Sequence, residues 1–228
     1  MRSVLQGELQ SVRDSIAMLS AQAVDATARA VDALIHRNFD QAREVKRDDK
    51  ATDALRYDIE RACLTAIATQ QPVAHDLREL IAASIIAVEL ERCGDYAKGV
   101  AKAARRIARH DNGIPTFNLA DMDRLARDML QRSTRAFLDG DVQAARQVLE
   151  DDDRLDQLYN ALLSQTMAAM TDNPRYIECG IWLLHAGHSL ERIGDRATNI
   201  AERVIFVATG ELVGDLNTHD VSQTRALQ

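Results

Sequence analysis

An internal repeat is the feature of this sequence that most limits its possible folds. Leu-Glu-Arg-Cys-Gly-Asp at residues 90–95 returns as Leu-Glu-Arg-Ile-Gly-Asp at residues 190–195, which is 100 residues later. A second set of matches relates residues 42–53 to residues 145–156 at an offset of 103 residues. Because the two sets occur in the same order at nearly equal offsets, they indicate a duplicated chain whose halves fold alike.

The composition predicts that both halves are helical. The 228 residues include only 10 Gly and 3 Pro, and aromatic residues make up 4%. Few turn-forming residues require long elements, and this composition favours helices and excludes an all-β sandwich or barrel. Turn signals and a 3.6-residue apolar period then predict six helices. Their ranges are 3–36, 40–70, 75–110, 118–138, 141–171 and 175–208.

Short connections between amphipathic helices are typical of antiparallel bundles. We therefore expect an all-α fold of two tandem, pseudo-symmetric three-helix bundles, the first over residues 1–112 and the second over residues 113–209. Residues 210–228 are polar and contain two Gly, so we expect them to form a polar tail.

The net charge and the arrangement of the cysteines exclude several functional classes. The net charge is −7 and no sustained Lys/Arg run occurs, so nucleic acid is not an expected partner. The densest basic cluster is Arg105, Arg106 and Arg109, which we interpret as favourable charge at a helix C-terminus. Three separate Cys argue against a disulfide framework or a zinc ribbon. Without a long apolar run or a signal-peptide core, we expect a cytoplasmic protein with no membrane insertion.

Acidic side chains recur at positions i and i+4 in both halves. Each predicted second helix carries one such pair and each predicted third helix carries another, so that four carboxylates per half share adjacent helix faces. The eight residues are Asp49, Asp53, Glu91, Asp95, Asp152, Asp156, Glu191 and Asp195. Like charges at this spacing destabilise a helix, and a bound cation offsets that repulsion. Oxygen ligands alone suit Fe, Mn, Mg or Ca better than zinc.

The alternative interpretation of these acids is a solvated surface with neighbouring counter-charges. The basic residues beside them are Lys50, Arg92, Arg154 and Arg192. His185 and His188 precede Glu191, but Ile85 and Val88 occupy the matching positions of the first half, so we interpret both His as core or surface residues.

Several common catalytic motifs are missing from the sequence. No Glu has His three residues later, and we find no nucleotide-binding glycine loop and no Gly-x-Ser-x-Gly motif. No backbone motif that cradles anions is evident either, so direct phosphate sensing is not expected. A carboxylate-bridged metal enzyme, of the phosphoesterase or di-metal oxidase type, remains the alternative to a binding protein.

The doubled motif resembles the PhoU family, which comprises accessory and regulatory proteins of bacterial phosphate uptake. The resemblance extends to about residue 208 and rests on the following segments: 72–78, 90–97, 190–197, 199–202 and the Asp49/Asp53 and Asp152/Asp156 pairs. It implies two similar three-helix bundles, with metal ions that include multinuclear iron clusters on the eight acidic residues. Lys98-Gly99 stands where the second half has Thr198-Asn199, so the first site is expected to bind differently.

The same resemblance implies a regulatory role. Members of the family are cytoplasmic, are often homodimers, and repress the phosphate-starvation response when phosphate is plentiful. They act through contact with the ATPase subunit of the phosphate ABC transporter and with a phosphate-sensing histidine kinase. We therefore expect a non-enzymatic, metal-binding adaptor with these partners.

Overall fold

Six long helices account for most of the chain. The computed structural model describes residues 2–110 and 114–211, without the side chains of Arg2, Asp49 and Lys50. The helices are α1 (Arg2–Ile35), α2 (Phe39–Gln70), α3 (Ala74–Ile107), α4 (Leu119–Asp139), α5 (Val142–Asp172) and α6 (Ile177–Thr209), and a 3-10 turn, η1 (Pro174–Tyr176), precedes α6. No strand occurs in the described ranges. The all-α prediction is confirmed, and each helix ends within three residues of its predicted range.

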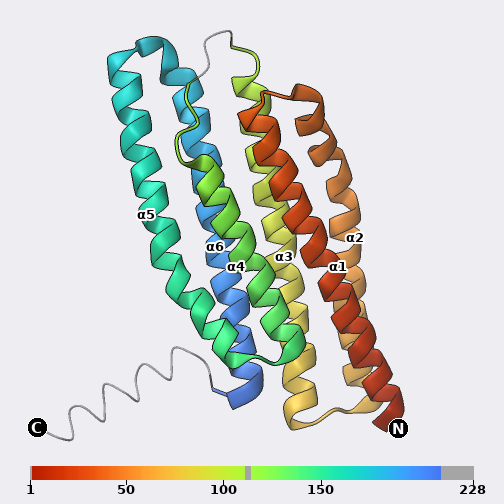
Figure 1. Ribbon diagram of the computed structural model, residues 1–228. Coiled ribbons are helices and arrows are strands. Elements are labelled where there is room, and N and C mark those ends of the chain that lie inside the picture. Colours follow the sequence, from red (N-terminus) through yellow and green to blue (C-terminus); the bar gives the residue numbers. More distant parts are fainter. Residues whose placement is uncertain (1, 111–113, 212–228) are drawn as a thin grey trace, which may run out of the picture.

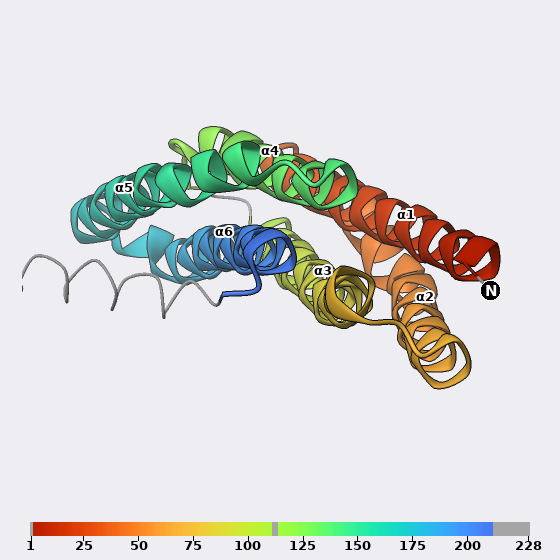
Figure 2. The same cartoon turned by 90° about the horizontal axis from the view of Figure 1, so that it is seen from below.

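The helices form two three-helix bundles that pack side by side (Figure 1). The end-on view in Figure 2 shows α1 and α4 in one layer, with α3 and α6 together beneath them and α2 and α5 at the outer flanks. One cluster of buried apolar side chains extends through both bundles. The predicted pseudo-symmetric pair of bundles is confirmed. The proposed boundary at residue 112 falls among residues 111–113, outside the described residues, as does most of the polar tail.

Local signals set the helix ends. The side chains of Asn38 and Asp141 accept hydrogen bonds from the backbone N–H groups of Gln41, at 3.1 Å, and Ala144, at 3.0 Å, so each caps the helix that follows it. Asn173 caps η1 instead of α6, because Pro174 starts a single 3-10 turn there. The helix predicted from residue 175 therefore begins as this tighter turn.

Three glycines let α5 approach α6 closely. Gly180, Gly187 and Gly194 recur every seven residues along α6 and face α5. A Cβ atom at Gly187 would collide with Leu162, and one at Gly194 would collide with Leu155. The glycine of the second Leu-Glu-Arg-x-Gly-Asp motif is thus required by packing, and the close approach brings the acids of α5 against those of α6.

Candidate functional site

The predicted acidic residues form two surfaces, one on each bundle. We call the set on α2 and α3 the first acidic surface, and it comprises Asp49, Asp53, Glu91 and Asp95. The set on α5 and α6 is the second acidic surface, and it comprises Asp152, Asp156, Glu191 and Asp195.

The carboxylates of the second acidic surface act on one another across the α5–α6 contact. Burial raises the pKa of Asp152, and the charges of Asp156, Asp195 and Asp153 raise it further. Burial likewise raises the pKa of Glu191, with further contributions in the same direction from Asp195 and Asp156. Asp156 and Asp195 therefore lie close enough to both Asp152 and Glu191 to disfavour the charged forms of these two carboxyls.

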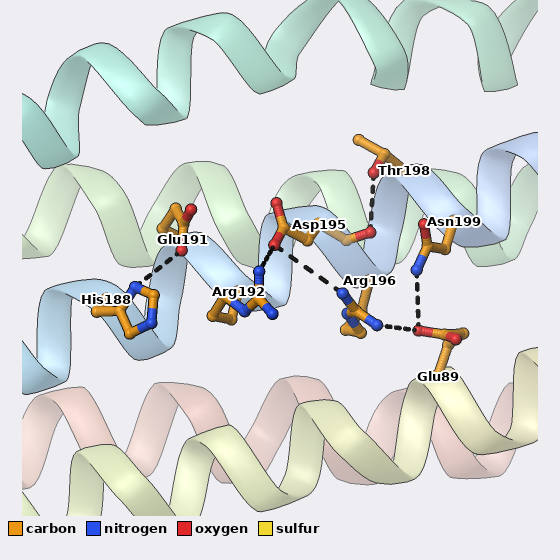
Figure 3. Close-up of polar contacts among 8 residues, drawn as sticks. All are labelled: Glu89, His188, Glu191, Arg192, Asp195, Arg196, Thr198 and Asn199. Atoms are coloured by element: carbon orange, nitrogen blue, oxygen red, sulfur yellow. Dashed lines mark hydrogen bonds and ion pairs between the residues drawn. The ribbon is translucent and has the colours of Figure 1, made fainter.

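Cations of α6 partly neutralise this surface (Figure 3). Arg192 lies 2.7 Å from Asp195, and Arg196 lies 3.9 Å from the same carboxylate. His188, which the sequence analysis interpreted as a core or surface residue, is an exposed side chain whose Nδ1 lies 3.1 Å from Glu191 Oε2. The contact lacks hydrogen-bond geometry, and Glu191 Oε2 is buried without a hydrogen-bond partner among the described residues. This oxygen is a potential ligand atom that the fold leaves unsatisfied.

The first acidic surface has a similar but more open arrangement. Burial raises the pKa of Glu91, and the charges of Asp95 and then Asp53 raise it further. Lys98 Nζ lies 2.5 Å from Asp95 Oδ1 and forms an ion pair there. The side chain of Asp49 lies outside the described residues. Acids from α2 and α3 thus face one another as the sequence predicts, with a lysine beside them that the second half lacks.

The acids converge without forming a preassembled metal site. Among the described side chains, no three His, Cys, Asp or Glu residues lie close enough together to hold a metal ion. Arg192 contacts one carboxylate oxygen of Asp195, and Lys98 contacts one of Asp95. To bind a metal ion with these oxygens, Asp195 and Asp95 would have to give up their ion pairs, and the acidic side chains would have to rotate toward the ion.

A buried polar network joins the two bundles beside the second acidic surface. Glu89 on α3 is 9% exposed and accepts hydrogen bonds from Arg196, at 3.1 Å, and from Asn199, at 3.3 Å (Figure 3). Sequence reasoning missed this contact because its partners lie more than 100 residues apart. The one available signal was an acid placed between the apolar residues Val88 and Leu90.

Two further features bear on the functional class. None of the described helices combines the length and the apolar character needed to cross a membrane. The side chains of Cys63, Cys93 and Cys179 are buried. Cys93 is fully buried within the apolar core cluster.

The chain is similar to proteins of one family along nearly its whole length. The PhoU domain pattern matches residues 16–104 and again residues 119–204. A protein of Caulobacter vibrioides named "Phosphate-specific transport system accessory protein PhoU homolog" is 35% identical over 205 residues, which cover 90% of this chain and 89% of that protein. An Aquifex aeolicus protein of the same name is 34% identical over 206 residues, which cover 90% of this chain and 93% of that protein.

Solved structures agree with these similarities. The crystal structure of PhoU from Pseudomonas aeruginosa matches with a TM-score of 0.86 and 30% identity, covering 90% of this chain and 99% of that one. The regulatory protein PhoU of the phosphate transport system from Streptococcus pneumoniae also matches with a TM-score of 0.86, at 29% identity, covering 92% of this chain and 99% of that one.

Proposed function

The chain belongs to the PhoU family, and on that premise we propose that it is a non-enzymatic accessory protein that regulates phosphate uptake and the phosphate-starvation response. The observation that carries this proposal is the match of the family pattern to both halves, together with relatives named as phosphate transport accessory proteins over 90% of the chain. The absence of a catalytic motif in the sequence agrees with an adaptor.

The proposed partners are the ATPase subunit of the phosphate ABC transporter and a phosphate-sensing histidine kinase. The protein would act in the cytoplasm as a homodimer, without binding nucleic acid. Long helices with exposed polar faces provide the rigid surface that an adaptor needs. The hydrophobic core that the two bundles share fixes these faces relative to each other.

The two acidic surfaces are the proposed metal sites, with Fe, Mn, Mg or Ca as the ion. Two observations support the fit: the donors are all carboxylate oxygens, and Glu191 Oε2 is buried without a hydrogen-bond partner in the described part of the chain. When bound, a cation would neutralise the facing carboxylates and link α2 to α3, or α5 to α6.

A genetic test addresses the regulatory role. In a strain that lacks the gene, we expect the phosphate-starvation response to stay active in phosphate-rich medium, and the wild-type gene should restore repression. The tagged protein should also retain the transporter ATPase on an affinity column. Normal repression in the deletion strain would refute the proposal, and metal-dependent turnover of a phosphoester by the pure protein would favour the enzymatic alternative.

Metal binding is tested by equilibrium dialysis followed by elemental analysis. We expect Asp156→Asn combined with Glu191→Gln to remove metal from the second acidic surface, and Asp53→Asn with Glu91→Gln to remove it from the first. The matched control is Asp128→Asn with Asp139→Asn, which deletes two exposed acids of α4 that pair with Arg132 and Arg135. Equal loss in the control, or no metal on the wild-type protein, would overturn the metal sites.

A further inference from the structure

A basic pocket lies where α2 begins and α3 ends. Figure 1 shows these two helix ends in the upper part of the view. Its volume is about 340 Å³. We call this feature the basic pocket, and its lining residues are Ala42, Lys46, Lys98, Gly99, Lys102, Arg105, Arg106 and Arg109. Six of the eight are Lys or Arg and none is acidic, although the whole chain carries a net charge of −7.

Most of these cations have no acidic partner among the described side chains. Lys98 pairs with Asp95. In residues 2–110 and 114–211, no ion pair involves the other five cations of the pocket. Arg105 Nε is in addition buried without a hydrogen-bond partner within this part of the chain. The pocket therefore concentrates positive charge that the described protein groups leave uncompensated.

Aromatic rings hold four of the cations in place. Arg105 lies over the Phe39 ring, with its Cζ 5.2 Å from the centroid, and Arg109 lies 5.9 Å from the same ring. Lys102 and Arg106 each lie 5.4 Å from the Trp182 ring of α6. Such contacts are favourable and limit side-chain rotation. The cations are thus positioned before any ligand arrives, which lowers the entropy lost on binding.

A helix dipole does not account for this cluster. Favourable interaction with the C-terminal dipole of α3 is limited to its last turn, which contains Arg105 and Arg106. Lys98 and Lys102 precede that turn, and Lys46 belongs to another helix. The interpretation of the arginines as helix-end charge is therefore incomplete.

The second bundle folds without an equivalent cluster. At the repeat offset of 100 residues, the four α3 cations and Arg109, which follows α3, correspond to Thr198, Glu202, Ile205, Phe206 and Thr209 of α6. The same architecture thus forms with no cation at any of these positions. The charge of the basic pocket is therefore not needed for folding and points to a ligand.

We propose that the basic pocket binds a small anion containing two or more linked phosphoryl groups. A single phosphate carries at most about two negative charges at neutral pH. It would leave most of the pocket's charge unmatched, whereas a diphosphate or triphosphate chain matches it more closely. Arg side chains bind phosphoryl oxygens in pairs, and a pocket of this volume accommodates a small molecule. Inorganic polyphosphate and a nucleoside di- or triphosphate share this chemistry.

Calorimetric titration distinguishes these sources. Tripolyphosphate, ATP and orthophosphate are each titrated into the full chain, with chelator present so that no metal bridges the ligand to an acidic surface. We expect tripolyphosphate and ATP to bind with affinity that falls as salt rises, and orthophosphate to bind at least about tenfold more weakly. Equal affinity for tripolyphosphate and ATP identifies the phosphate chain as the recognised group, and tighter ATP binding adds the nucleoside.

The variant Lys102→Gln with Arg106→Gln tests the location. Both side chains are exposed, so we expect the double variant to fold, as checked by circular dichroism and thermal unfolding. It should weaken tripolyphosphate binding about tenfold or more, because two charge-assisted contacts are lost. The control Arg146→Gln with Arg154→Gln removes two exposed cations of α5 and should leave the affinity unchanged. Equal effects of the two variants, equal binding of orthophosphate, or no binding would each overturn the proposal.

Discussion

At the scale of the residue, the folded structure disfavours the charged form of the Asp152 carboxyl. Burial raises the pKa of this carboxyl above 3.8, and three neighbouring aspartates raise it further. Because the folded protein holds the proton more tightly than the unfolded chain, this group lowers the free energy of unfolding as pH rises above that value. We expect Asp152→Asn to raise the free energy of unfolding of the metal-free protein at neutral pH by a few tenths of a kcal/mol, about 0.5.

Urea unfolding across a range of pH measures this effect. The gain should disappear below the ordinary pKa of Asp, where the wild-type carboxyl is protonated in both states. Glu150→Gln removes an exposed acid from the same helix and is expected to change little. A destabilised Asp152→Asn protein at neutral pH would contradict the interpretation that like charges crowd this position.

The cysteines provide a second prediction at this scale. Burial raises the pKa of Cys63 to about 11 and also raises the pKa of Cys93 and Cys179. Only the thiolate reacts with disulfide reagents, so the folded protein should react slowly at mildly alkaline pH. Spectrophotometric thiol titration should find three reactive thiols only after denaturation. Rapid stoichiometric modification of the native protein would show that one of them is accessible.

At the scale of the element, replacing the glycines of α6 tests whether helix packing or helix propensity has the larger effect on stability. Gly187→Ala and Gly194→Ala would press a methyl group into Leu162 and Leu155, which are both fully buried and enclosed. We expect each substitution to lower the free energy of unfolding, because overpacking costs about 1–3 kcal/mol and the gain in helix propensity is at most about 1 kcal/mol.

Two other glycines serve as controls in the same denaturation experiment. Gly7 lies in α1, and apart from the adjacent residues and backbone of α1 itself, no atom comes within 4 Å of the position that an alanine methyl would take there, so Gly7→Ala should stabilise the protein by up to about 1 kcal/mol. Gly180→Ala meets the flexible, partly exposed Met170 and should cost less than the other two α6 variants. If all four substitutions stabilised the protein, the close approach of α5 to α6 would be refuted.

At the scale of the whole molecule, Glu89 links the two bundles through Arg196 and Asn199. Glu89→Ala leaves a largely buried guanidinium without its carboxylate, so we expect a loss of about 2 kcal/mol in the free energy of unfolding. Glu89→Gln keeps an accepting oxygen and should cost less. Asp139→Ala removes an exposed ion pair with Arg135 and should cost less than about 1 kcal/mol. Equal losses for Glu89→Ala and Asp139→Ala would contradict a structural role for this network.

The sequence predicted most of the architecture because its signals are local. An apolar period of 3.6 residues fixes which side of each helix is buried, and capping residues such as Asn38 and Asp141 mark where helices begin. The i, i+4 acid pairs on the predicted second and third helices of each half also predicted that acids of α5 and α6 would share adjacent helix faces. The metal that they would hold stays a prediction.

Only the tertiary structure decided which charges meet across helices. Arg196 forms an ion pair with Glu89 of the other bundle. Lys46 of α2 and Arg106 of α3 line the same pocket, and Arg106 lies over the Trp182 ring of α6. No spacing in the sequence relates these residues, because electrostatic interaction depends on distance through space, and that distance is set by how complete helices pack. The sequence by itself therefore determined the six helices and their duplication, whereas the buried network and the basic pocket exist only because the packed bundles bring distant positions together.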